Sequence, residues 1–115
     1  MLFKSHDEYF AAQPVDVRKR LQQVQQQVES RVPGAIRTIS CNMPAFKNER
    51  TFFYFAAFKK HIGIYPPVTK DDALIAETEA LRGPKGNLAF QHDQELPLAL
   101  IGRVAAALAA QYAEK

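Results

Sequence analysis

Few side chains in this 115-residue chain combine a reactive type with a useful spacing, and His61 is the best placed of them. An imidazole changes its charge near neutral pH and binds metal ions, so it could serve as a base or a ligand. No second histidine, cysteine or carboxylate lies at ligand or base spacing from it, and His6 and His92 fall in a predicted helix cap and a predicted loop. We therefore interpret His61 first as a structural or surface residue of a strand.

Carboxylates occur in small groups. Their oxygens are hard ligands that suit iron, calcium or magnesium. Acidic residues also collect at helix N-termini through the helix dipole, and Glu77 and Glu79, two apart on a predicted helix, do not face each other. None of the groups has the spacing of a preformed metal site; they are Asp7–Glu8, Asp71–Asp72, Glu77 with Glu79, and Asp93 with Glu95.

The overall charge indicates no dominant class of partner. Fifteen basic and twelve acidic residues leave a formal charge of +3. Basic residues beside aromatic ones could suit single-stranded nucleic acid, but phosphate binding needs a clustered positive surface, so we expect no nucleic-acid partner. With 47% hydrophobic and 23% charged residues, the chain resembles an ordinary globular protein, and residues 1–115 are predicted to form a single domain.

Cysteine content and hydropathy suggest a location. A single cysteine, Cys41, excludes an internal disulfide and a cysteine-based zinc site. The first ten residues, MLFKSHDEYF, carry charges where a signal peptide needs an apolar segment. No apolar run approaches the ~20 residues that a membrane span requires. We therefore expect a cytoplasmic protein with no membrane partner.

Capping and periodicity predict the helices. Ser5 followed by Glu8 fits a capping box, so a short helix should run from Asp7 to Ala12. A second helix should follow Pro14 and end near Arg31, and two more are predicted for residues 69–82 and from about residue 97 onward. The second helix has a buried stripe and an opposite polar side, made respectively of Val17, Leu21, Val24 and Val28, and of Arg18, Gln22, Gln25 and Glu29.

Alternation predicts four strands. They cover residues 35–43, 51–58, 61–65 and 87–91, and Pro44 should end the first because proline cannot donate to a central ladder. Neighbouring strands between helices favour an α+β fold. We expect an antiparallel sheet of about four or five strands, with the N- and C-terminal helices packed on one face.

Parity then separates the two faces of that sheet. Alternation places Ile39, Cys41 and Met43 with Ile62 and Ile64 toward the helices, so Cys41 should be an inert core thiol. A hairpin with its tip at residues 59–60 adds two aromatic residues to the other face. That face could hold a ligand or a partner, or it could be solvated or covered by a loop or a second copy. It would carry Thr38, Ser40, Asn42, Tyr54, Phe58, His61, Tyr65, Asn87 and Gln91.

Four segments in order along the chain resemble the YdhG-like family of small bacterial domains. They are MPAFK at residues 43–47, YFAAFKKHIGIYP at 54–66, KG before LAFQ at 85–91, and LPLALI at 96–101. The resemblance implies a frataxin-like fold, with helices on one face of an antiparallel sheet. One branch of this group is regarded as intracellular iron chaperones that hand iron to a receiving protein.

Two function hypotheses follow, and neither is an enzyme, because general acid–base work needs a base within reach of a reacting group. The resemblance implies a non-enzymatic iron-binding chaperone; its first metal candidates are His6, Asp7 and Glu8, with Glu77 and Glu79 as a second patch. The alternative is a binding module, monomeric or homodimeric, that uses the open sheet face for a small anionic ligand or a protein. Its ligand-binding residues would be Ser40, Asn42, Tyr54, His61 and Tyr65.

Overall fold

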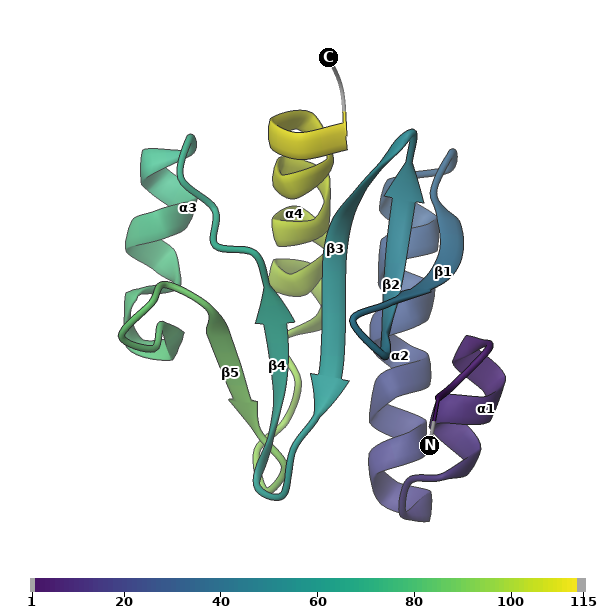
Figure 1. Ribbon diagram of the computed structural model, residues 1–115. Coiled ribbons are helices and arrows are strands. Elements are labelled where there is room, and N and C mark those ends of the chain that lie inside the picture. Colours follow the sequence, from purple (N-terminus) through teal and green to yellow (C-terminus); the bar gives the residue numbers. More distant parts are fainter. Residues whose placement is uncertain (1, 114–115) are drawn as a thin grey trace.

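A computed structural model describes residues 2–113 and contains one five-stranded antiparallel sheet (Figure 1). The strands lie in chain order, so each pairs with the next one in sequence. The predicted α+β class and antiparallel sheet are confirmed. The strands are β1 (Ile36–Ser40), β2 (Met43–Asn48), β3 (Arg50–Ala57), β4 (His61–Tyr65) and β5 (Leu88–Gln91).

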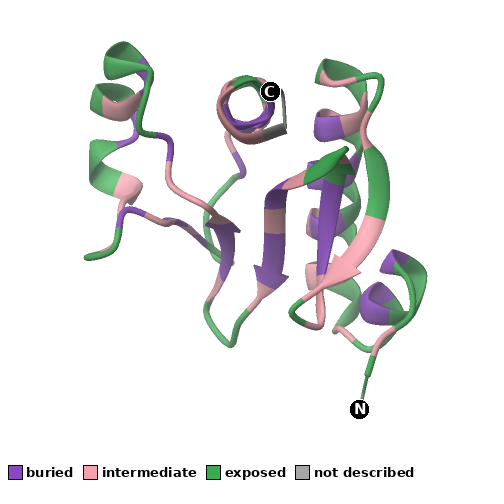
Figure 2. Ribbon diagram, turned by 45° about the horizontal axis from the view of Figure 1, so that its top comes forward, coloured by how far each residue is buried: buried purple, intermediate pink, exposed green. Residues whose placement is uncertain are grey.

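Helices precede the sheet, interrupt it between β4 and β5, and follow it. Figures 1 and 2 show α2 and α4 against the same face of the sheet, with α1 beside the lower end of α2. None of the helices within residues 2–113 combines the length and apolar character needed to cross a membrane. The helices are α1 (His6–Ala11), α2 (Val15–Arg31), α3 (Asp72–Glu77) with the short η1 (Glu79–Leu81), and α4 (Leu98–Leu108), which continues into the π-helical η2 (Ala109–Ala113).

The core lies between the sheet and the α2–α4 layer (Figure 2). In α2, the predicted stripe is buried at Leu21, Val24 and Val28. Burial of each such side chain contributes about 1.5–3 kcal/mol relative to exposure, so this packing supplies most of the driving force. On the sheet side the buried residues include Phe46, Phe53, Phe55, Ile62, Ile64, Leu88 and Phe90.

The helix starts follow the sequence signals. Ser5 is the N-cap of α1, and its hydroxyl accepts a hydrogen bond from the Glu8 N–H at 3.1 Å. Asp71 caps α3 in the same way. The predicted helix over residues 69–82 is too long, because the Thr78 hydroxyl donates to the carbonyl oxygens of Leu74 and Ile75 at the end of α3.

The prediction of one strand over residues 35–43 was wrong. Cys41 and Asn42 have φ angles of +55° and +57°, and they form a tight turn that joins Ser40 to Met43. Pro44 then lies inside β2, opposite Ile39. It is tolerated because β2 pairs with β3 only from residue 45 onward, so its missing N–H interrupts no pair on that side.

A bulge in β3 brings two adjacent phenylalanines into the core. Phe46 pairs with Phe53, whereas Lys47 pairs with Thr51, so Phe52 has no partner on β2. Both Phe52 and Phe53 are fully buried. The unpaired residue at the bulge therefore explains why two consecutive residues of β3 can both be apolar and buried.

Candidate functional site

The sheet face opposite the helices carries four aromatic rings around the β3–β4 hairpin, and we call Tyr54, Phe58, His61 and Tyr65 the aromatic face. Tyr54 and Tyr65 are direct neighbours in the β3–β4 ladder. The Phe58 and His61 rings are stacked, with centroids 5.0 Å apart and an angle of 23° between their planes. The predicted hairpin with Lys59 and Lys60 at its tip is confirmed, since Phe58 donates its N–H to the His61 carbonyl.

Gly63 is what lets these rings lie close against the sheet. A Cβ atom at this position would lie 2.7 Å from the Tyr65 hydroxyl oxygen and 3.0 Å from Cε2 of Phe58. Real Cβ atoms do not approach other atoms this closely, so any larger residue would displace one of the rings. Glycine in the middle of β4 therefore provides room for the aromatic layer.

The aromatic face is half-exposed and can make mixed contacts. Phe58 is 43% exposed, and Tyr54, His61 and Tyr65 are intermediate. Burial, with a smaller contribution from the nearby Tyr9, raises the pKa of Tyr65, so its phenol stays neutral near pH 7 and can donate or accept a hydrogen bond. Large rings with a polar end are typical of the centres of protein interfaces.

The β1–β2 turn changes the placement of three predicted residues. Asn42 lies in the turn instead of on a strand face, and its side-chain oxygen accepts the Phe3 N–H at 2.8 Å. Ser40 is the last residue of β1 and pairs with Met43, away from the four rings. Cys41 is exposed in the turn, so its predicted burial was wrong. Parity failed here because β1 ends at Ser40, three residues before the predicted end of the strand.

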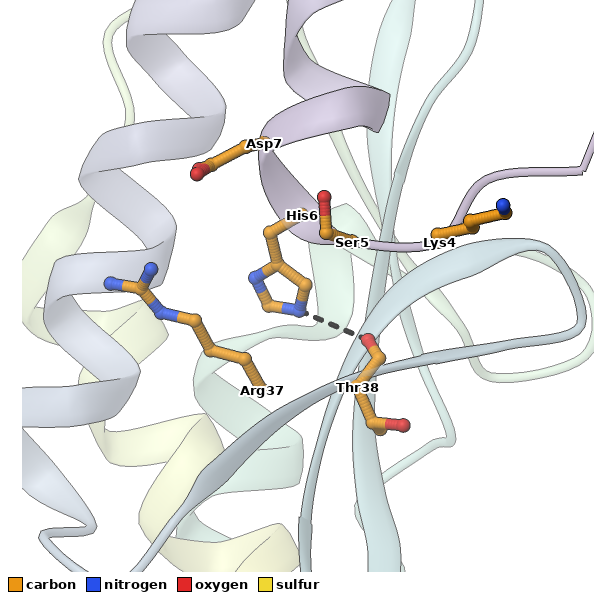
Figure 3. A pocket seen from close by; sticks show the side chains of 6 residues that line it. All are labelled: Lys4, Ser5, His6, Asp7, Arg37 and Thr38. Carbon is orange, nitrogen blue, oxygen red and sulfur yellow. Dashed lines mark hydrogen bonds between the residues drawn. The ribbon is translucent and has the colours of Figure 1, made fainter.

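His6, the first predicted metal ligand, is held inside the protein (Figure 3). Its Nε2 lies 3.0 Å from the Thr38 carbonyl oxygen and 2.9 Å from that of Ala45. Carbonyls only accept, so Nε2 carries the proton, and Nδ1 accepts from the Gln25 amide at 3.0 Å. Burial lowers the pKa of His6, and the cation of Arg37 adds to this effect. Both ring nitrogens are thus occupied by protein groups.

The acidic metal candidates do not converge. Asp7 lines a hollow of about 140 Å³ beside α1, and Figure 3 shows its carboxylate directed away from the His6 ring. Glu8 accepts the Lys4 N–H at 2.9 Å. Glu77 forms a two-pronged ion pair with Arg103, at 2.8 and 2.7 Å, which lowers the pKa of its carboxyl group. Glu79 follows in η1. Within residues 2–113, no three His, Cys, Asp or Glu side chains group as a metal site.

Several polar residues of α1 and α2 have structural roles that the helical pattern did not predict. Gln25, expected on the outer side of α2, is buried against His6. Arg18 donates to carbonyl oxygens at the end of α1, including those of Phe10 and Gln13. The Tyr9 hydroxyl accepts the Ala57 N–H of β3 at 2.9 Å. A run of glutamines on the helix offered no signal to single out Gln25.

One solved structure with this fold is the crystal structure of a protein from the DUF1801 family, YdhG from Bacillus subtilis. It matches with a TM-score of 0.75 over 94% of this chain and 90% of that chain, at 18% sequence identity. The match supports the predicted YdhG-like architecture, and at this identity it shows the fold alone. No protein-family model matches the sequence, and no curated protein is significantly similar to it.

Proposed function

We propose that this protein is a non-enzymatic binding module that docks a protein partner on its aromatic face. The observation that carries the proposal is the ring layer itself, in which Phe58 stacks on His61 and Tyr65 lies over Gly63. A ring 43% exposed on a packed sheet, as Phe58 is, offers apolar area that a partner can cover. The neighbouring hydroxyl and imidazole groups add directional hydrogen bonds.

A protein fits this surface better than a small molecule does. Small-molecule sites are concave and enclose most of their ligand. Here the Tyr65 and Phe58 rings cover the glycine that could otherwise form a hollow in the sheet. Aromatic side chains also supply much of the binding energy in protein interfaces, whereas a small anion would leave most of their area in water.

A site-specific photo-crosslinker tests the proposal. We would place p-benzoylphenylalanine at Phe58 and, as a matched control, at Val15, which is 58% exposed at the start of α2. Cells that express the protein are irradiated, and crosslinked species are identified by mass spectrometry. We expect one defined partner at position 58 and none at position 15. Equal crosslinking at both positions, or none at position 58, would overturn the proposal.

The identified partner is then tested in purified form. His61→Ala with Tyr65→Ala should abolish binding while leaving the far-ultraviolet circular dichroism and the melting temperature close to those of the parent. Sedimentation of the same variants reports whether the partner is a second copy, since a homodimer through this face would dissociate. Binding that survives the double substitution would exclude the aromatic face.

Iron handling remains a second proposal, and it rests on the sequence resemblance to frataxin-like chaperones, as does the frataxin-like description of the fold. Its candidate ligands are His6, Asp7, Glu8, Glu77 and Glu79. An anaerobic ferrous iron titration followed by calorimetry and amide NMR tests it. Saturable binding with shifts at Asp7, Glu8 or Glu77 would support it; the absence of heat and of localised shifts would exclude it.

A further inference from the structure

A second surface feature adjoins the aromatic face at the tip of the β3–β4 hairpin. It is a hollow of about 380 Å³ lined by Lys59, Lys60, Gln91, His92 and Asp93, which we call the basic hollow. Gln91 pairs with His61 in the β4–β5 ladder. The hollow therefore begins where the aromatic face ends, and one extended partner could contact both.

Hydrogen bonds hold one rim of the basic hollow to the hairpin. The His92 ring bonds through Nε2 to the Phe58 carbonyl oxygen at 2.8 Å, and its backbone N–H donates to the Lys60 carbonyl oxygen at 2.9 Å. These two bonds tie the segment after β5 to both ends of the two-lysine turn. The lysine backbone is thereby set in position, while the side chains of Lys59 and Lys60 are exposed.

Arg20 of α2 holds the other rim. Its guanidinium donates to the carbonyl oxygens of Gln91 and Gln94, each at 2.7 Å, and so braces the turn that contains His92 and Asp93. In the sequence, this arginine belongs to a helix that lies more than seventy residues before Gln91 and Gln94. The hollow is therefore a braced feature of the fold, built from three separate segments.

The charge of the basic hollow is positive. Lys59 and Lys60 line it with two cations, and Asp93 is the one carboxylate among its lining residues. The guanidinium of Arg20 lies behind the rim, bonded to the carbonyl oxygens of Gln91 and Gln94. Burial lowers the pKa of Arg20, and the negative charge of Asp93 offsets part of that effect. Within residues 2–113, neither lysine has a carboxylate partner: the ion pairs found join Arg37 to Glu29 and Arg103 to Glu77. Two cations thus remain available.

The sheet hairpins as a whole share this bias. Between Ile36 and Tyr65 the chain has five basic residues and one acidic residue, Glu49, although its total charge is only +3. Arg37 of β1 is ion-paired with Glu29, whereas four others lie at or beside the β2–β3 and β3–β4 turns and form no ion pair within residues 2–113: Lys47, Arg50, Lys59 and Lys60. A partner that approaches the β3–β4 turn would meet a positive potential, which favours an acidic one.

We propose that the basic hollow binds side-chain carboxylates of an acidic protein segment whose remainder lies on the aromatic face. This inference rests on the proposed function and specifies the chemistry of its partner. Lys59 and Lys60 pair with the carboxylates, and the rim bonds of His92 and Arg20 hold those lysines in reach. Rim charges of this kind mainly set the association rate and its dependence on salt.

The test uses a blocked hexaglutamate peptide as the probe for the basic hollow. The full chain, labelled with ¹⁵N, is titrated at low ionic strength and followed by amide NMR. We expect saturable shifts at residues 59–60 and 91–93 that disappear at high salt. Lys59→Glu with Lys60→Glu should weaken binding at least about fivefold, as loss of two exposed ion pairs predicts. Lys19→Glu with Lys85→Glu changes the net charge equally but should leave the binding in place.

Inorganic phosphate is titrated in parallel to separate a carboxylate segment from a free anion. If phosphate gives the same shifts with equal or higher affinity, or if hexaglutamate shifts other regions, the inference is overturned. Phe58→Ala should leave hexaglutamate binding unchanged, because this probe contacts only the hollow. Failure of hexaglutamate to bind the hollow, with intact crosslinking at position 58, therefore rejects this inference alone. Binding of hexaglutamate without crosslinking at position 58 rejects the proposed function, and with it the inference, and leaves only a carboxylate-binding hollow.

Discussion

Two histidines on opposite faces of one sheet show how differently the same side chain is used. His6 lies under α1 on the helix side, 2% exposed, with both ring nitrogens hydrogen-bonded to the protein. His61 lies on the open side, half-exposed and stacked on Phe58. The sequence made both of them candidates for chemistry. The comparison shows that a saturated histidine holds the fold together, whereas an accessible one is available to a partner.

The largest expected effect separates these two histidines. His6→Ala removes a ring and leaves the Gln25 amide and the carbonyl oxygens of Thr38 and Ala45 without their partner. A cavity and unsatisfied buried groups together should lower the free energy of unfolding by about 3–5 kcal/mol. His61→Ala should lower it by less than about 1 kcal/mol. Urea unfolding of both variants measures the difference, and similar losses would refute the contrast.

His6 should make stability depend on pH. Burial lowers the folded-state pKa of His6 below that of an unfolded histidine, about 6.5. Between the two values the unfolded chain binds more protons, so the stabilisation is present above about pH 6.5 and is lost as the pH falls toward the folded pKa. The slope for this one group cannot exceed about 1.4 kcal/mol per pH unit.

Urea unfolding between pH 7.5 and 5 measures that slope in the parent and in one variant. His6→Gln should lose this contribution. If the His6 variant keeps the full slope, the stability loss has another origin and the assignment is wrong.

A smaller effect probes the aromatic layer. Gly63→Ala places a methyl group where the Tyr65 hydroxyl and the Phe58 ring now lie, so it should cost about 1–3 kcal/mol. Gly83→Ala is the matched control, because its Cβ would meet only the Asn87 carbonyl oxygen, at 3.6 Å. In a Tyr65→Ala background the cost of Gly63→Ala should shrink. Additive costs in this double-mutant cycle would show that the ring does not lie over the glycine.

The smallest effect compares two tyrosine hydroxyls. Tyr9→Phe leaves the Ala57 N–H without its acceptor and should cost about 1 kcal/mol. Tyr65→Phe should be close to neutral for stability, since its hydroxyl has no hydrogen bond within residues 2–113. Thermal unfolding ranks the two variants; a larger loss for Tyr65→Phe would mean that the open face, too, is held by buried hydrogen bonds.

Much of the fold could be predicted because its signals are local. Ser5 and Glu8 marked the start of α1, and spacings of three and four marked the buried stripe of α2. Alternation around a two-lysine tip placed Tyr54, Phe58, His61 and Tyr65 together, and the β3–β4 register confirms the pairing. In each case the deciding residues lie within a few positions of one another.

The predictions from sequence were wrong where contacts or backbone conformations of the folded chain overrode a local sequence rule. Proline normally ends a strand, yet Pro44 continues one because the neighbouring ladder starts after it. The alternation of apolar residues predicted that Cys41 faces the core. Instead, Cys41 and Asn42 adopt positive φ angles and form a turn, so the strand has already ended at this position. Gln25 sits at a polar position of α2 and is buried only because α1 presents His6 to it.

By itself, then, the sequence determined the α+β class, the antiparallel sheet, most helix starts and the residues of the aromatic face. These features could be predicted because hydrophobic periodicity and helix capping depend only on residues a few positions apart. Only the tertiary structure decided that His6 is saturated, that Glu77 pairs with Arg103, and that Arg20 braces the basic hollow next to Lys59 and Lys60. These contacts join residues 19 to 74 positions apart. Whether a polar side chain is available depends on which distant groups the packed fold places within hydrogen-bonding distance of it.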